Sequence, residues 1–396
     1  MREGIIPIFF TYDSKVQIES GYLLEVKINN KNVIYQIIDG ITKQELLEAK
    51  NKSGFIIAEA IQLGVWDSAQ NRFLKFGWVP DINTPVHIIP KYPITESEND
   101  VIKIGTIPNS NLPIYMDIEK AISHHLAVLG VTGTGKSVFV RYLLDQYIKK
   151  NNKKVFIFDF TGEHKKKINK YRIFMPTASE KEIYDSFSLI NKEMDKFANQ
   201  RLESVLTTNK TKIETIILGK INEFISSPDT LSIVELPDAE NTQNVFDYIR
   251  VFFKQLFNEA KKHLGDSNFP QICIVLEEAH TIIPEWNTSS EMNNKASQSA
   301  LNAISQIALQ GRKYNVGLLI IAQRTANVSK TVLTQCNSIV SFQMYDKTSM
   351  DFLSNYYGDG ISEMLPTLKP RQAISGGKAF SSSVPIIFEV PDLQGY

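Results

Sequence analysis

The most constraining feature of this chain is a glycine-rich turn at residues 130–137, which reads Gly-Val-Thr-Gly-Thr-Gly-Lys-Ser. This is the phosphate-binding P-loop pattern G-x-x-x-x-G-K-[ST]. A short apolar run, residues 126–129, precedes the turn, and a helix-like pattern, residues 138–144, follows it. A strand, a loop and a helix in this order are the context that the pattern needs. The turn therefore predicts a site for the phosphates of a nucleotide.

Each residue type in the turn has a chemical reason to be there. Glycine lets the backbone turn tightly enough to point several N–H groups at one phosphate chain, and the following helix adds its positive end. The lysine would neutralise the β- and γ-phosphates, and the last hydroxyl would ligate Mg²⁺. We therefore expect ATP and Mg²⁺ as cofactors, with the nucleotide bound by Gly130, Thr132, Gly133, Thr134, Gly135, Lys136 and Ser137.

Composition narrows the class of protein. The 396 residues suggest two or three domains, and 43 basic residues balance 43 acidic ones. The chain thus has no overall basic character of the kind that many nucleic-acid binders show, although a locally basic pore would leave this total unchanged.

Two cysteines provide no disulfide framework. No apolar run approaches the roughly 20 residues that span a bilayer, and the N-terminus does not resemble a signal peptide. We expect a cytoplasmic protein with no membrane partner.

The chain divides into two parts by its residue pattern. Residues 1–108 hold short apolar runs separated by turn signals, including an expected hairpin at 22–38, which predicts a small β-barrel. Over residues 109–396, strand-like runs alternate with helical patterns, which predicts an α/β domain with a mostly parallel sheet. A polar, helix-periodic stretch at 178–226 is interpreted as a helical insertion. The strand candidates are residues 126–129, 155–158, 233–236, 272–276, 317–322 and 338–342.

Two carboxylates follow the apolar run 272–276. Glu277 and Glu278 stand where that strand would end, and in a parallel sheet the carboxyl ends of the strands face the ligand crevice. Two acids there could hold Mg²⁺ and polarise an attacking water. We assign Glu277 to the metal and Glu278 to the catalytic base. Alone, the pair could be two solvated acids at a strand end, but a P-loop upstream favours the functional interpretation.

Other strand ends and turns carry further candidates. Gln323 follows the run 317–322 and is placed to sense the γ-phosphate or hold the attacking water, unless it is a plain turn residue. Arg312 could reach a nucleotide on the same or a neighbouring subunit as an arginine finger, or could complement a helix dipole, and Arg324 could serve instead. Asp159 ends another strand candidate and could support the metal site or be an ordinary loop acid.

Two segments are candidates for contact with DNA. A local basic cluster could face phosphates in a pore, and a solvated charge run is an equally good interpretation; it consists of Lys165, Lys166, Lys167, Lys170 and Arg172. The polar stretch Asn287–Lys295, after the acidic pair, is a second candidate pore loop. Among the histidines, His280 is worth a test.

Taken in order, these motifs resemble the HerA-like ATPases of the HerA/FtsK superfamily of DNA-pumping motors. The specific part is Glu-Glu-Ala-His at 277–280, Gly-Arg-Lys-Tyr at 311–314 and Gln-Arg at 323–324, combined with the P-loop. The resemblance covers about residues 109–390, and the β-rich start resembles the family's N-terminal (HAS) barrel. It implies a RecA-like P-loop ATPase core and a homo-oligomer, a hexameric ring, with ATP bound between subunits. It also implies double-stranded DNA in the channel and a nuclease (NurA-like) or other effector docked on the ring.

Two functions compete at this point. The first is ATP-driven translocation of double-stranded DNA, with a nuclease partner, in end resection. The second is a scaffold that assembles and gates an anti-phage effector, such as a nuclease or a Sir2-like NAD-consuming domain, without processive translocation. The chemistry at the nucleotide is the same in both. A third interpretation, a P-loop kinase for a small metabolite, fits the predicted barrel and the long helical insertion poorly.

Overall fold

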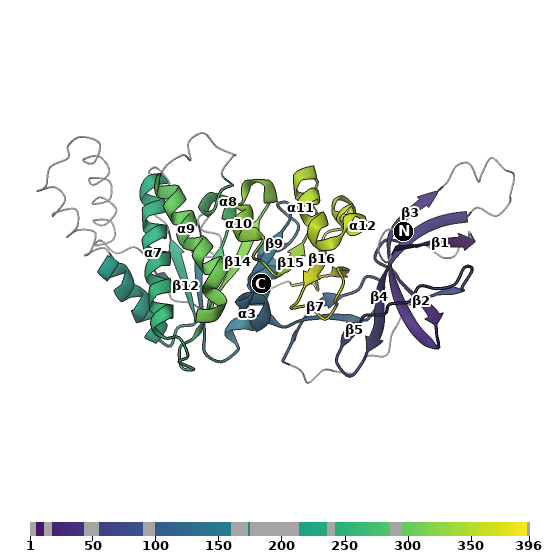
Figure 1. The fold of residues 1–396 in the computed structure, drawn as a ribbon, viewed down its shortest axis with the longest axis horizontal. Coiled ribbons are helices and arrows are strands. Elements are labelled where there is room, and N and C mark those ends of the chain that lie inside the picture. Colours follow the sequence, from purple (N-terminus) through teal and green to yellow (C-terminus); the bar gives the residue numbers. More distant parts are fainter. Residues whose placement is uncertain are drawn as a thin grey trace, which may run out of the picture. The chain divides into compact units, whose positions relative to one another are not determined.

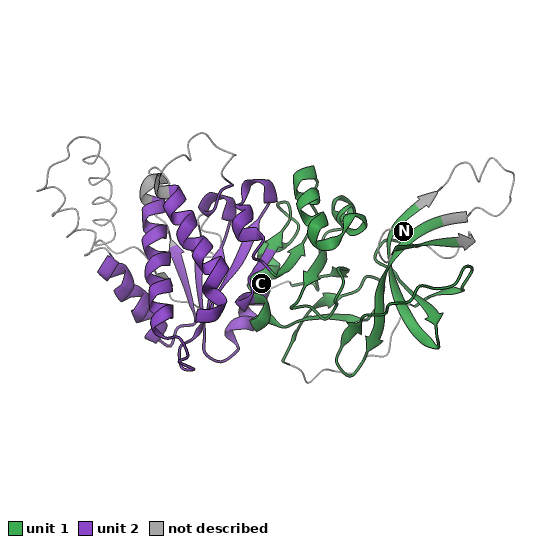
Figure 2. Ribbon diagram, in the orientation of Figure 1, with its two compact units in different colours: residues 1–121, 128–142, 337–396 green, residues 122–127, 143–336 purple. Residues whose placement is uncertain are grey.

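The computed structural model describes residues 5–11, 18–42, 55–89, 100–159, 173–174, 214–235, 242–285 and 295–393 (Figure 1). The chain forms two compact units (Figure 2). Unit 1 consists of residues 1–121, 128–142 and 337–396, and unit 2 consists of residues 122–127 and 143–336. Three expected segments lie wholly or largely outside the described residues: the basic cluster Lys165–Arg172, residues 287–294 of the second candidate pore loop, and residues 178–213 of the expected insertion.

An antiparallel half-barrel begins unit 1. Its strands lie in the order β1-β4-β3-β2-β6, with β5 paired to β4. Their bounds are Ile5–Thr11 (β1), Leu23–Ile28 (β2), Lys31–Thr42 (β3), Phe55–Asp67 (β4), Arg72–Leu74 (β5) and Val86–Ile88 (β6). The hairpin of β2 and β3 turns through Asn29 and Asn30, whose φ angles are 48° and 63°. Asparagine tolerates the positive φ that a two-residue hairpin turn requires, so the expected hairpin forms.

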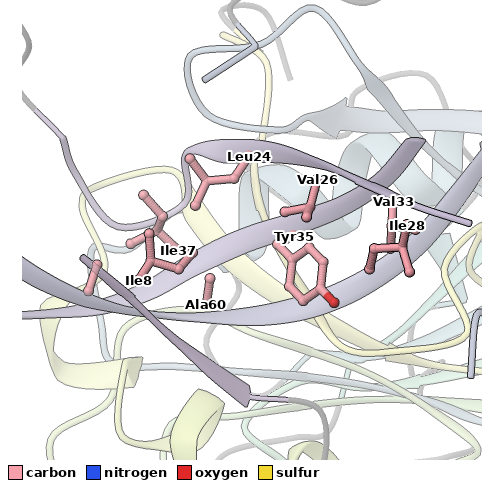
Figure 3. Packing of buried hydrophobic residues seen from close by; sticks show 9 residues of the cluster. Ile8, Leu24, Val26, Ile28, Val33, Tyr35, Ile37 and Ala60 are labelled. Carbon is pink, nitrogen blue, oxygen red and sulfur yellow. The ribbon is translucent and has the colours of Figure 1, made fainter. Parts of the chain in front are cut away.

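The half-barrel has an apolar core (Figure 3). Alternate residues of a strand point to the same face, and Leu24, Val26 and Ile28 of β2 are accordingly buried together. Tyr35 of β3 lies among them, and its hydroxyl accepts a hydrogen bond from Gln62 Nε2 at 2.7 Å. The polar end of this buried ring is therefore satisfied. The other members of the core are Ile8, Val33, Ile37, Ala58 and Ala60.

The rest of unit 1 is the antiparallel part of a second sheet. Its strands lie in the order β15 (Ser338–Ser341), β16 (Gln372–Gly377), β17 (Ile386–Glu389), β7 (Ile102–Thr106) and β8 (Pro113–Met116). Between β15 and β16 the chain forms α11 (Lys347–Tyr357), α12 (Asp359–Ser362) and the short η3 (Leu365–Thr367). Gln36 joins the half-barrel to β17, because its side chain donates to Ile387 O at 2.8 Å and accepts from Ile387 N at 2.8 Å. This buried amide thus links the two parts of unit 1.

Unit 2 contains a parallel sheet packed against helices. Its strands lie in the order β11 (Ile173–Phe174), β12 (Leu231–Glu235), β10 (Lys153–Asp159), β13 (Gln271–Leu276) and β14 (Val316–Ala322). Each is parallel to its neighbours. Two long helices, α7 (Thr242–Lys262) and α9 (Lys295–Gln310), lie side by side along this sheet (Figure 1). Every residue of β14 is buried, as expected for an apolar strand in a covered parallel sheet.

The strand that leads into the P-loop is divided between the units. In β9 (Leu126–Leu129), residues 126–127 belong to unit 2 and residues 128–129 to unit 1. Two helices are divided in the same way, α2 (Ile118–Ser123) and α3 (Lys136–Ile148). The P-loop itself belongs to unit 1, whereas the acidic and glutamine candidates belong to unit 2.

The structure confirms the expected fold class. The chain has a mixed α/β fold with a mostly parallel sheet, preceded by an antiparallel half-barrel. All six expected strands form, with ends that differ by no more than two residues. The domain boundary near residue 108 and the insertion stay predictions. Within the described ranges, no helix is long and apolar enough to cross a membrane.

Candidate nucleotide site

The P-loop turns where its sequence predicts. Helix α3 begins at Lys136, immediately after the glycines. Gly130, Gly133 and Gly135 have φ angles of 146°, 83° and 102°, a region that other residues rarely adopt. At Gly133 and Gly135, an added Cβ would have no heavy atom within 4 Å. The turn therefore leaves open space beside its backbone, at the start of a helix, which fits a phosphate group.

The P-loop is held by the segment that follows β15. Phe342 N donates to Leu129 O at 2.8 Å, and Val131 N donates to Gln343 O at 2.9 Å. At Gly130, an added Cβ would lie 2.7 Å from Cβ of Phe342, closer than two such atoms can approach. The first glycine of the loop is thus required both by its φ angle and by this close packing. All of these residues belong to unit 1.

Lys136 folds back over the loop. Its Nζ donates to Val131 O at 2.9 Å, and Thr134 Oγ1 donates to the same carbonyl at 2.8 Å. Ser137 follows in the first turn of α3 and is partly exposed, whereas Thr132 is exposed at the tip of the turn. A lysine ammonium, the positive end of a 13-residue helix and an open glycine turn together suit a phosphate chain.

Two adjacent parallel strands of unit 2 end in carboxylates. Asp159 is the last residue of β10, and Glu277 directly follows β13, whose Leu276 is paired in register with Phe158. Both acids are buried, with 4% of each residue exposed. Oxygen ligands of this kind suit Mg²⁺, but no group of three or more His, Cys, Asp or Glu in the described residues could hold a metal by itself. The residues fit an ion that takes its remaining ligands from water and nucleotide phosphates, as Mg²⁺ usually does.

Glu278 is the most unusual residue of this region. Its backbone is left-handed, with φ 47° and ψ 54°, a strained conformation that is uncommon outside glycine and that clusters at functional sites. Gln323, directly after β14, donates from Nε2 to Glu278 Oε1 at 2.6 Å. The second oxygen, Oε2, lies 3.3 Å from Nδ1 of His280, but it is buried and accepts no hydrogen bond from the described residues. The structure thus brings Glu278, Gln323 and His280 together, and one carboxylate oxygen of Glu278 accepts no hydrogen bond from the described residues.

The loops that follow β13 and β14 are joined a second time. Glu285 N donates to Asn327 O at 2.9 Å, and the side chain of Glu285 accepts a hydrogen bond from Lys330 N at 2.7 Å. The loop that carries the acidic pair and the loop that carries the glutamine are therefore held in a fixed register. The sequence pattern did not indicate Glu285, because its partner lies 45 residues away and no local motif marks it.

The two candidate arginines are both exposed. Arg312 lies in the short η1 (Gly311–Tyr314) after α9, and Arg324 directly precedes η2 (Thr325–Asn327). An exposed guanidinium group can reach a second molecule, which is what a finger acting on a neighbouring subunit requires. Which of the two arginines acts as the finger stays a prediction.

His125 is a buried residue of unit 2 whose role the sequence did not indicate. Its Nδ1 accepts from Leu318 N at 3.0 Å, so the proton is on Nε2, which donates to Ala308 O at 2.9 Å. The imidazole thereby joins the chain before β9 to β14 and α9. Burial lowers the pKa of His125 from 6.5 to about 4, because the charged ring would lose its water.

Comparison with known proteins gives a family match. Residues 102–358 match the family described as "Helicase HerA, central domain". "Probable helicase MJ1565" of Methanocaldococcus jannaschii is 24% identical over 344 residues, which cover 71% of this chain and 64% of that protein. "DNA double-strand break repair helicase HerA" of Saccharolobus solfataricus is 24% identical over 340 residues, which cover 69% of this chain and 65% of that protein. The chain therefore spans a little less than two thirds of the length of these curated relatives.

Comparison with solved structures gives more distant matches. VirB4 of Thermoanaerobacter pseudethanolicus is 11% identical with a TM-score of 0.46, covering 74% of this chain and 98% of that one. The genome packaging NTPase B204 from Sulfolobus turreted icosahedral virus 2, in complex with ATP-gammaS, is 13% identical with a TM-score of 0.43. That match covers 69% of this chain and 99% of B204. Both scores are below 0.5, so these likenesses say nothing about function.

Proposed function

We propose that this chain, which belongs to the HerA helicase family by its central domain, is an ATP-hydrolysing motor that acts on double-stranded DNA. The observation that carries the proposal is the carboxylate of Glu278, with Oε1 held by Gln323 and Oε2 buried without a hydrogen-bond donor among the described residues. A positioned base of this kind beside a glutamine is what an enzyme needs to activate a water for attack on a phosphate.

Phosphate binding is assigned to the P-loop. The backbone N–H groups around Gly133 and Gly135 and the N-terminus of α3 would face the phosphates. Lys136, now bonded to Val131 O at 2.9 Å, would exchange this carbonyl for β- and γ-phosphate oxygens. A neutral acceptor would thereby be replaced by a charged one, which strengthens the hydrogen bond.

Three residues are assigned to Mg²⁺. Ser137 would supply a hydroxyl ligand, and Glu277, with Asp159 in support, would supply carboxylate oxygen directly or through water. When bound, this ion neutralises charge that develops on the phosphates during transfer. Both acids are buried, so bulk water would compete little with the ion for their oxygens.

Water activation is assigned to Glu278 and Gln323. Oε2 of Glu278 would take the proton of the attacking water, because Oε1 is occupied by the glutamine amide. Release of this 2.6 Å bond would free the amide to contact the γ-phosphate or the water. The position of the Glu278 carboxylate would then depend on whether Gln323 contacts a bound nucleotide. His280, whose Nδ1 lies 3.3 Å from Oε2, would help to position the same oxygen.

The larger assembly is proposed from the family and from the exposed arginines. A homo-oligomeric ring, hexameric in the HerA-like pattern, would let Arg312 or Arg324 act on the nucleotide of a neighbouring subunit. Double-strand break repair, named for the Saccharolobus relative, supports duplex DNA as the substrate. The partner proposed with it is a NurA-like nuclease, which the resemblance to HerA-like ATPases implies. The balanced charge of 43 basic and 43 acidic residues instead favours the second candidate. That candidate is a scaffold that gates an anti-phage effector, a nuclease or a Sir2-like NAD-consuming domain.

Two substitutions test the nucleotide chemistry. Lys136→Ala should weaken ATP binding at least about tenfold, the size of a lost charged hydrogen bond, whereas Lys149→Ala, just after the end of α3, should not. Glu278→Gln should keep ATP binding and lower the hydrolysis rate about 10²- to 10⁴-fold, the usual share of a general base, and surface Glu223→Gln should be neutral. Hydrolysis at the parental rate in Glu278→Gln would show that the base is assigned wrongly.

A further inference from the structure

An exposed aromatic side chain, Tyr345, closely follows in sequence a segment of unit 1 that contacts the P-loop. Tyr345 follows β15 and is 60% exposed. Two residues earlier, Gln343 O accepts the hydrogen bond from Val131 N of the P-loop at 2.9 Å. The ring is therefore within two residues of a backbone contact with the loop that would hold the phosphates. Neither the sequence motifs nor the roles assigned above account for it.

The residues on each side of Tyr345 are fixed. Met344 is fully buried, and its N–H donates to Leu365 O at 3.3 Å. Asp346 is the N-cap of α11, and its side chain accepts a hydrogen bond from Ser349 N at 2.9 Å. A buried residue on one side and a helix cap on the other set the direction of the backbone between them. Tyr345 is thus a ring presented to solvent from a rigid support, which limits the entropy lost when something packs on it.

The base of a bound nucleotide can pack on an exposed aromatic ring. The P-loop accounts for the phosphates, but it offers nothing to the apolar faces of the base, which must lie within one nucleotide length of the loop. A base stacks on any exposed aromatic face, and such stacking tolerates different bases. The other exposed tyrosine of this region, Tyr356, lies on α11 and already packs against Phe352 with ring centroids 5.3 Å apart. Tyr345 is the better placed of the two because Gln343, two residues before it, contacts the loop.

We propose that Tyr345 is the stacking platform for the base of the nucleotide whose phosphates bind the P-loop. This inference rests on the proposed function, because it needs a nucleoside triphosphate in the loop. It adds a binding residue for the base, which no motif of the chain assigned. Since stacking is tolerant of base identity, it also predicts that Tyr345 strengthens binding of adenine and guanine nucleotides alike.

The test compares a ligand that has a base with one that lacks it. Calorimetric titration of the full chain with ATPγS and with inorganic tripolyphosphate is done for the parental protein and for Tyr345→Ala. We expect ATPγS to bind about tenfold more weakly to Tyr345→Ala, the effect of losing one base–aromatic stack, and tripolyphosphate to bind as before. Tyr345→Phe should restore ATPγS binding because the ring is retained, and Tyr356→Ala should behave as the parental chain.

Two results would overturn the inference. Unchanged ATPγS affinity in Tyr345→Ala would show that the ring does not touch the base. An equal loss for both ligands would show that the substitution disturbs the P-loop instead. Failure of the proposed function looks different: ATPγS and tripolyphosphate would both fail to bind the parental chain, or Lys136→Ala would leave both affinities unchanged.

Discussion

His125 gives a prediction whose size can be worked from the structure. Its ring joins three elements of unit 2 only in the neutral form, since Nδ1 must accept the hydrogen bond from Leu318 N while Nε2 donates to Ala308 O. Protonation would place a second N–H against the Leu318 amide in a buried site. Acid should therefore weaken the packing of the chain that leads into β9.

The magnitude follows from the lowered pKa. A fall from 6.5 in the unfolded chain to about 4 in the folded one corresponds to about 3 kcal/mol, at 1.36 kcal/mol for each tenfold change in proton affinity. The unfolded chain binds the proton first as the pH falls. Above pH 6.5 the lowered pKa of His125 thus has no effect on the free energy of unfolding. As the pH falls from 6.5 to about 4, this free energy decreases progressively.

The matched variant is His125→Asn. Asparagine tolerates the left-handed backbone of this position, φ 63°, and its Oδ1 can accept from Leu318 N, but it has no proton to gain in this range. It loses the bond to Ala308 O at every pH. Urea unfolding of both proteins from pH 7.5 to pH 4 should show the stability advantage of the parental chain shrinking by up to about 3 kcal/mol. An advantage that does not change with pH would refute the reasoning.

Three further predictions concern the site itself. Gly130→Ala should reduce nucleotide affinity and thermal stability together, because the Cβ clashes with the segment after β15; a variant that binds ATP normally would contradict this packing. Gln323→Ala should leave ATP affinity nearly unchanged while slowing hydrolysis, measured as kcat, because it removes the 2.6 Å bond to Glu278; an unchanged kcat would exclude a role for the amide. Mixing inactive Arg312→Ala and Lys136→Ala chains should partly restore hydrolysis if the arginine acts on a neighbouring subunit, and no recovery at any ratio would exclude that action.

The sequence predicted the parts of the fold that depend on local pattern. Continuous apolar runs marked β10, β13 and β14, because a strand covered on both faces needs no polar side. The glycine spacing predicted the P-loop, since the positive φ of Gly133 and Gly135 is a conformation that glycine readily adopts. The strand order, which the sequence did not predict, brings the acidic loop and the glutamine loop together, because parallel neighbours end at the same edge.

Contacts between distant residues could not be predicted in this way. His125 bonds to residues 183 and 193 positions away, and nothing in its own neighbourhood specifies either partner. The left-handed backbone of Glu278 has no sequence signal either, because glutamate rarely adopts it and only the surrounding packing imposes it. The sequence did not indicate a binding role for Tyr345, because this role depends on the contact between Gln343 and Val131. In each case the tertiary fold, rather than the local sequence, determines the role of the side chain.

The most direct test of the central claim is the ATPase rate of the purified full chain with and without linear duplex DNA. The salt should be about 100 mM, where protein–phosphate contacts are not yet screened out. A DNA motor predicts hydrolysis that duplex DNA stimulates several-fold and that Glu278→Gln abolishes in both conditions. Hydrolysis that is indifferent to duplex DNA would contradict the motor and favour the effector scaffold. The same rate in Glu278→Gln as in the parental chain would contradict the proposed chemistry altogether.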